Sequence, residues 1–178
     1  LKSSLPKVLH TINDKPMIHM VIDALNNASI NTILVVVGHE AQKVQKACEE
    51  KASDFILQEP QLGTGHAVMV SKEALIKTNT DYVIVLPGDC PLISHQTIQH
   101  IQQLHESNNA TATILSTKLD EPSHYGRIIR NSANQVTGIR EAKDCSENEL
   151  KINEINRNLY FTACFLLLCR CFNIFFCY

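Results

Sequence analysis

The sequence lacks a surplus of basic residues, since 16 Lys and Arg face 18 Asp and Glu for a net charge of −2. This balance excludes the electrostatic footprint of a dedicated nucleic-acid binder. The first seven residues lack the apolar stretch of a secretory signal. Repeats and low-complexity linkers are absent as well, and 178 residues suffice for one domain with a real core. We therefore expect a single cytoplasmic domain.

Metal-binding cysteine spacing is also missing. Four of the seven cysteines crowd into the last fifteen residues, and none forms a pair separated by two residues. Cys169 and Cys171 have no second pair and no nearby histidines, so we expect no zinc site. Without a secretory signal, free thiols are the better interpretation.

The last twenty residues have few polar groups, with only Arg170 and Asn173 strongly polar. Their number would span a membrane. However, Arg170 near the centre would cost roughly 2.5–3.5 kcal/mol on insertion scales, and no basic cluster flanks the segment. We expect no membrane anchor, and we interpret the end as a strand over residues 159–168 that runs into an aberrant apolar tail, residues 163–178.

Strand and helix patterns alternate along the chain. Residues 32–37 form a continuous β-branched run, typical of a strand covered on both faces. Pro16 suits a first helical turn, with Asn13 or Asp14 as its cap. We expect strands at 32–37, 54–57, 82–86 and 110–117, helices at 17–25, 41–48, 65–76 and 94–104, and a short helix or loop at 144–151. The alternation predicts an α/β fold with a Rossmann-like, mostly parallel sheet, helices on both faces, and a β-hairpin insertion near residues 125–139.

Two segments carry the chemistry. Gln-Leu-Gly-Thr-Gly-His-Ala at residues 61–67 is a glycine-rich turn that opens a helix, and the buried strand after residue 82 ends in Gly88 and Asp89. Ligands of open α/β sheets bind at the carboxyl ends of the strands. Exposed backbone N–H groups and a lone carboxylate suit a nucleotide phosphate and its Mg²⁺. The pattern therefore indicates a nucleotide-handling enzyme.

Six segments together resemble one family. Residues 5–10, 57–67, 88–92, 125–130, 141–144 and 154–156 match, in order and spacing, the uridylyltransferase domain of the bifunctional bacterial enzyme that makes UDP-N-acetylglucosamine. The combination of residues 61–67 with Tyr-Gly-Arg-Ile at 125–128 is the most specific part. The resemblance covers residues 1–162 and implies a fold of the nucleotide-diphospho-sugar transferase type.

The resemblance implies Mg²⁺-dependent transfer of UMP from UTP to N-acetylglucosamine 1-phosphate, with release of pyrophosphate. Such transfer relies on positioning and charge neutralisation rather than on covalent catalysis. The product feeds cell-envelope synthesis, both peptidoglycan and lipopolysaccharide. Two alternatives stay open: a nucleotidyltransferase for another sugar or alcohol phosphate, and a degenerate nucleotide-binding protein without turnover.

Matched residue by residue, the resemblance implies two catalytic side chains, Lys7 on the nucleotide phosphates and Asp89 as a ligand of the metal. A solvated surface lysine and a helix-capping aspartate are the structural alternatives. The implied substrate-binding residues are Gln58 at the uracil edge, Gly63 and Thr64 around the nucleoside, Gly88 at a close backbone approach, and Gly126, Glu141 and Asn156 at the sugar. His66 stays unassigned.

The sequence also departs from the family. Pro87 stands where relatives often carry an aromatic residue, and Arg157 and Asn158 stand where the family has Thr-Gly. The family's opening strand and glycine-rich loop would precede Leu1. A second metal-binding asparagine and the acetyltransferase domain that makes relatives homo-oligomeric would follow the last residue. We therefore expect the 178-residue chain by itself to be poorly active or inactive.

Overall fold

The computed structural model describes residues 5–163, so the predicted apolar tail lies outside the described residues apart from Ala163. The strands are β1 (Thr11–Ile12), β2 (Lys15–Pro16), β3 (Leu34–Val37), β4 (Asp54–Leu57), β5 (Tyr82–Val85), β6 (Ala112–Lys118), β7 (Arg127–Arg130), β8 (Val136–Arg140) and β9 (Glu154–Ala163). The helices are α1 (Met17–Asn27), α2 (Ala41–Cys48), α3 (Thr64–Val70), α4 (Lys72–Thr78), α5 (His95–Ser107) and α6 (Glu147–Leu150), with 3-10 turns η1 (Lys7–Leu9) and η2 (Ala142–Asp144).

The fold is mixed α/β, as the alternation predicts. β3 and β4 pair in parallel, and a larger sheet runs in the order β5-β9-β7-β8, with β6 on β9. Every pairing in this larger sheet is antiparallel, so within residues 5–163 a mostly parallel sheet is not confirmed. The reason is β9, a ten-residue strand that returns between β5 and β6. A buried apolar run does not reveal its direction, which only its partners set.

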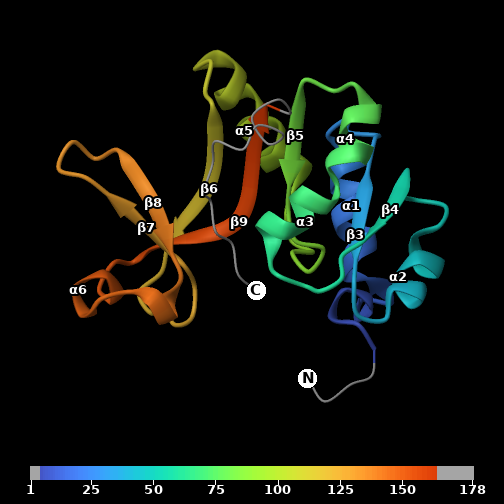
Figure 1. Cartoon of the computed structure of the whole chain (residues 1–178), viewed down its shortest axis with the longest axis horizontal. Helices are drawn as coiled ribbons and strands as arrows, with labels where there is room; N and C mark the ends of the chain where they lie inside the picture. Colours follow the sequence, from blue (N-terminus) through green and yellow to red (C-terminus); the bar gives the residue numbers. More distant parts are fainter. Residues whose placement is uncertain (1–4, 164–178) are drawn as a thin grey trace.

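The predicted hairpin is present as β7 and β8. Asn131 Oδ1 accepts from the N–H groups of Ala133 and Gln135, which closes the polar turn. The hairpin and α6 form one end of the molecule, and α2 with the β3–β4 pair forms the other (Figure 1).

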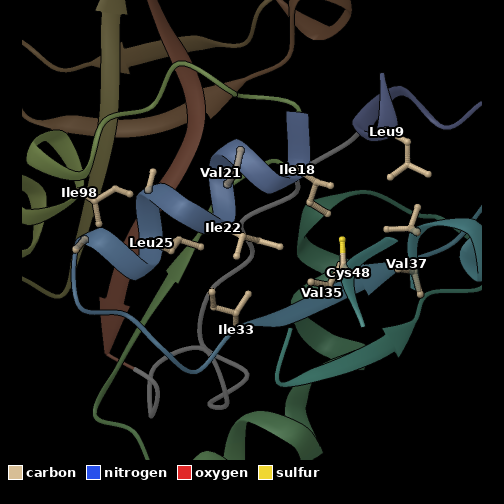
Figure 2. Packing of buried hydrophobic residues seen from close by; sticks show 13 residues of the cluster. Leu9, Ile18, Val21, Ile22, Leu25, Ile33, Val35, Val37, Cys48 and Ile98 are labelled. Carbon is tan, nitrogen blue, oxygen red and sulfur yellow. The ribbon is translucent and has the colours of Figure 1, made fainter. Parts of the chain in front are cut away.

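The main core lies between α1 and β3. Ile18, Val21, Ile22 and Leu25 recur at helical spacing and are buried in one cluster with Val35 and Val37 of β3, and Figure 2 shows Ile18 and Ile22 pointing towards this strand. The predicted cap of this helix is wrong. Asn13 and Asp14 have φ of 49° and 62° and instead form the turn between β1 and β2, where paired positive φ values are the rule for tight hairpins.

The helix predicted over residues 65–76 is broken in two at Ser71. The buried Ser71 hydroxyl donates to the carbonyl of Ala67 at 2.7 Å, a contact that bends helices, and α4 starts at the next residue. The helix predicted from Ser94 is confirmed as α5, because the Thr97 N–H donates to Ser94 Oγ at 3.1 Å.

Cys48, Cys90 and Cys145, the cysteines in the described part of the chain, are free thiols. In the same residues, no helix combines the length and the apolar character that crossing a membrane requires.

Candidate active site

The two residues predicted as catalytic lie in direct contact. Lys7 projects from η1 and Asp89 follows β5, and Lys7 Nζ lies 2.6 Å from Asp89 Oδ2. The hydrogen bond and negative charge of Asp89 raise the pKa of Lys7, so the ammonium stays charged well above neutral pH. Lys7 is largely exposed, whereas Asp89 is three-quarters buried. Residues far apart in sequence thus form one charged pair at the carboxyl end of a core strand.

Gly88 has a packing reason to be glycine. A Cβ at this position would lie 3.3 Å from Val8 Cγ1 and 3.6 Å from the Ile18 side chain. The loop after β5 therefore lies directly on η1 and α1, and this contact brings Asp89 to Lys7. The predicted close approach of a ligand at Gly88 remains a prediction.

Gln58 directly follows β4, and its side chain is buried. Its Nε2 donates to the carbonyl of Gly63 at 2.9 Å and contacts His66 Nδ1 at 3.2 Å. Because a carbonyl only accepts, the contacting atom must be the amide nitrogen, and His66 Nδ1 must accept its second proton. This contact corresponds to the His66 tautomer with its proton on Nε2. The Gln58 Oε1 acceptor has no protein partner within residues 5–163.

Gly63 requires its glycine. Its φ of 96° with ψ of −179° belongs to a region that side chains disfavour. The carbonyl of Gly63 accepts from Gln58 and also from the Ala67 N–H at 3.0 Å. This turn starts α3 at Thr64, which is buried. The predicted turn is therefore held from both sides, by the strand end and by the helix.

The three predicted sugar residues also come together. The Asn156 N–H donates to the Gly126 carbonyl at 2.9 Å, and a Cβ on Gly126 would lie 3.2 Å from Glu141 Oε1. Burial raises the pKa of the Glu141 carboxyl. β7, β8 and β9 thus converge where Gly126, Glu141 and Asn156 lie.

The Asn156 side chain is engaged within the protein. It is buried; its Nδ2 donates to Asn158 Oδ1 at 2.7 Å and to the Tyr160 hydroxyl, and its Oδ1 accepts from the Asn158 N–H at 3.0 Å. Asn158 has φ of 55°, the left-handed region that favours glycine and tolerates asparagine. In this structure Asn156 organises the start of β9.

Sequence reasoning missed the role of Arg157 in this region. Its guanidinium carbon lies 5.9 Å from the centre of the Tyr125 ring, in cation–π geometry. Burial, and then the charge of Asp89, raises the pKa of the Cys90 thiol, while the positive charges of Arg157 and Lys7 act in the opposite direction. Arg157 and Lys7 therefore approach the same Asp89–Cys90 loop. No local sequence signal could reveal the contact between Arg157 and Tyr125, because these residues lie far apart in the sequence.

The donor set at Asp89 fits a Mg²⁺ ion that arrives with a nucleotide. Mg²⁺ prefers oxygen ligands and is usually held by one or two carboxylates together with substrate phosphates and waters. Asp89 Oδ2 binds Lys7, and Oδ1 has no partner within residues 5–163. In that part of the chain no group of three or more His, Cys, Asp or Glu side chains could hold a metal by itself. Asp89 can thus supply one ligand, with the remainder left to substrate and water.

The sequence matches a known protein family over most of its length. Residues 2–154 match the nucleotidyl transferase family. The bifunctional protein GlmU of Clostridium tetani is 44% identical over 174 residues, which are 98% of this chain and 36% of the relative. GlmU of Clostridium kluyveri is 46% identical over 160 residues, 90% of this chain and 35% of the relative. The chain thus spans about a third of the length of these relatives, and the resemblance drawn from the motifs is confirmed.

Solved structures show the same fold at low identity. HddC from Yersinia pseudotuberculosis superposes with a TM-score of 0.70 at 20% identity, covering 98% of this chain and 75% of that one. A UDP-glucose pyrophosphorylase complexed with UDP-glucose gives 0.70 at 19% identity, covering 89% and 68%. These two likenesses bear on the fold alone, while the family match spans most of the sequence. The chain belongs to the nucleotidyl transferase family.

Proposed function

We propose that this chain transfers UMP from UTP to N-acetylglucosamine 1-phosphate, giving UDP-N-acetylglucosamine and pyrophosphate, and that residues 1–162 form its nucleotidyltransferase domain. The family match and the similarity to the bifunctional protein GlmU support this assignment. The observation that carries it is the Lys7–Asp89 pair at the end of β5, because it places a cation for phosphates beside a carboxylate with an open oxygen.

The reaction requires neither a covalent intermediate with the protein nor a general base. An oxygen of the sugar phosphate is already anionic at neutral pH, so it forms the new bond to the α-phosphorus without a general base. The bond from the α-phosphorus to the bridging oxygen breaks, and pyrophosphate leaves with the electron pair. Lys7 orients the triphosphate, since its ammonium has three donors and Asp89 uses one of them. Asp89 would supply one ligand to Mg²⁺, which when bound would neutralise charge on the triphosphate.

Gln58 gives a physical reason for uracil selectivity. With both Nε2 protons committed to Gly63 and His66, the side chain offers only the Oε1 acceptor. Uracil presents a donor at N3–H, whereas N3 of cytosine is an acceptor and would face Oε1 without a shared proton. We therefore propose that Gln58 selects UTP over CTP.

At the sugar, we propose that Glu141 accepts from a hydroxyl and that Gly126 gives the ring room beside it. Asn156 fixes the backbone of Gly126 through its own N–H. For its side chain to bind the sugar, one of its bonds to Asn158 or Tyr160 would have to be exchanged.

The test is release of pyrophosphate from UTP and N-acetylglucosamine 1-phosphate with Mg²⁺, alongside calorimetric titration with UTP, each measured on the 178-residue chain and on a version extended at both ends with the corresponding segments of Clostridium tetani GlmU. Asp89→Asn should lower turnover by roughly 10²- to 10³-fold, the usual effect of losing one preorganised charge-stabilising group. Asp81→Asn, an exposed carboxylate at the opposite end of β5, is the matched control and should change neither quantity.

The outcomes separate the alternatives. If turnover with glucose 1-phosphate equals that with N-acetylglucosamine 1-phosphate, the chain is a nucleotidyltransferase for another sugar phosphate. UTP binding without pyrophosphate release would indicate a nucleotide-binding protein without turnover. Absence of both binding and turnover would refute the proposed function.

A further inference from the structure

Arg157 carries a positive charge that no described residue neutralises. Its side chain is exposed, and it has no hydrogen-bond or ion-pair partner within residues 5–163. The Tyr125 ring lies beneath the guanidinium, which restricts its orientation. A guanidinium has five N–H donors in a fixed fork that matches phosphate oxygens. Arg157 is therefore held in place with its donors available.

The neighbouring cation is in a different state. The positive charges of Arg157 and Lys7 both lower the pKa of the Cys90 thiol, so both side chains lie around the loop after β5. Lys7 is paired with Asp89, but Arg157 is not paired with a carboxylate within the described residues. The loop thus has one neutralised and one uncompensated positive charge beside it, and the second favours an anionic ligand.

A hollow of about 410 Å³ opens beside Arg157, between the start of α5 and β6. Its walls are apolar or hydroxyl-bearing, among them Ile93 and Thr97, and Arg157 is the ionisable group in its lining. No described carboxylate lines this hollow, and Glu154, which accepts from the lining residue Ser116, is itself paired with Arg130.

We propose that Arg157 binds the phosphate of the sugar 1-phosphate acceptor, an inference that rests on the proposed function. The position favours the acceptor over the nucleotide. Arg157 directly follows Asn156, and Tyr125 directly precedes Gly126, so both partners of the cation–π contact are attached to the predicted sugar end. Lys7 and Asp89 lie on η1 and the loop after β5, near the same end, so an acceptor phosphate held by Arg157 would lie close to the nucleotide phosphates that it attacks. The family resemblance has threonine at position 157, so this contact belongs to the present sequence.

The experiment measures the dissociation constants of N-acetylglucosamine 1-phosphate and of UTP separately, by calorimetric titration of the 178-residue chain with Mg²⁺. Arg157→Gln should weaken binding of the sugar phosphate by roughly 5- to 20-fold, which is the range for losing a charged hydrogen bond at an exposed site. UTP affinity should stay within about twofold. Arg157→Lys keeps the charge but loses the planar set of N–H donors. Its affinity for the sugar phosphate should therefore lie between those of the unmodified chain and Arg157→Gln.

Lys118→Gln is the matched control, because it removes an exposed cation from β6, the strand paired with β9. It should leave both affinities unchanged, which separates a direct contact from a general loss of positive charge. Added salt should weaken sugar-phosphate binding more in the unmodified chain than in Arg157→Gln.

Each outcome decides something. If the unmodified chain binds both ligands and Arg157→Gln binds them equally well, the role of Arg157 is wrong while the proposed function stands. If Arg157→Gln weakens UTP instead, the residue serves the nucleotide and the acceptor assignment is wrong. If the unmodified chain binds neither ligand, the proposed function itself fails.

Discussion

Replacing Gln58 by leucine tests how the strand end and the glycine turn cooperate. The change keeps the side-chain volume but removes the donor to Gly63 and His66 and the Oε1 acceptor. The carbonyl of Gly63 keeps its bond from the Ala67 N–H, and His66 is half-buried, so water can satisfy its nitrogen. The expected loss of unfolding free energy is therefore that of two ordinary hydrogen bonds, about 1–2 kcal/mol.

The same substitution should affect nucleotide choice more than stability. Oε1 is the group that we assign to uracil N3–H, and a site that hydrogen-bonds its substrate rejects the mismatched analogue strongly. Losing this acceptor should reduce the preference for UTP over CTP by roughly 1–3 kcal/mol, or about 5- to 150-fold.

Calorimetric titration with UTP and with CTP, in Mg²⁺, measures the preference, and urea unfolding measures the stability. Gln61→Leu, the same exchange at an exposed position in the same loop, should change neither the preference nor, appreciably, the stability. If the unmodified chain binds CTP as tightly as UTP, or if Gln58→Leu keeps its full preference, the acceptor reasoning is refuted.

Substitutions at three further positions test other parts of the structure. Gly63→Ala places a Cβ at φ of 96° and should cost roughly 1–3 kcal/mol in urea unfolding and weaken UTP binding, and an unchanged midpoint would contradict the strain. The hydrogen bond from Arg130 lowers the pKa of Glu154 from 4.5 to about 2, so its stabilisation is present above pH 4.5 and is lost as pH falls towards 2. Glu154→Gln should accordingly cost roughly 1–3 kcal/mol at pH 7 and little near pH 2, and a pH-independent cost would refute the ion-pair origin. Asn158→Gly suits the φ of 55° but loses the hydrogen bond from Asn156 Nδ2, so it should lower the free energy of unfolding by about 1 kcal/mol. Asn158→Ala loses the same bond and also places an unsuited side chain at this φ, so it should lower that free energy by about 2 kcal/mol. The reverse order would rule out this account.

Periodicity predicted the local structure well where one face decides it. The spacing from Met17 to Leu25 gives α1, and the short apolar run that ends at Leu57 gives β4 with the predicted bounds. Burial of one stripe or one face is a local property, so the sequence carries it directly.

Polar residues with two possible uses were harder. Asn13 and Asp14 can cap a helix or form a hairpin turn, and Ser71 can lie inside a helix or bend it. In each case the choice depends on a partner outside the local pattern: the pairing of β1 with β2, and the burial of Ser71 against its neighbours. The same holds for the antiparallel direction of β9, which its pairing with β5 and β6 determines.

The meeting of Lys7 with Asp89 came from the family resemblance rather than from the residues alone. Composition cannot distinguish this lysine from an exposed surface lysine. The distance of 2.6 Å does so, together with the contact of Gly88 on Val8 that brings the two loops together. Packing of apolar neighbours thus fixes the position of the charged pair.

The segment from Asn156 to Asn158 departs from the family pattern at positions 157 and 158. Asn158 adopts the left-handed conformation that the family's glycine would favour. Its side chain accepts a hydrogen bond from Asn156 Nδ2, and its backbone N–H donates to Asn156 Oδ1. At the start of β9 the Asn156 N–H donates to the Gly126 carbonyl. What differs is position 157, where an arginine lies over Tyr125. Because the turn holds its shape, the added charge has a defined place beside the site, and a change in acceptor affinity is the effect to look for.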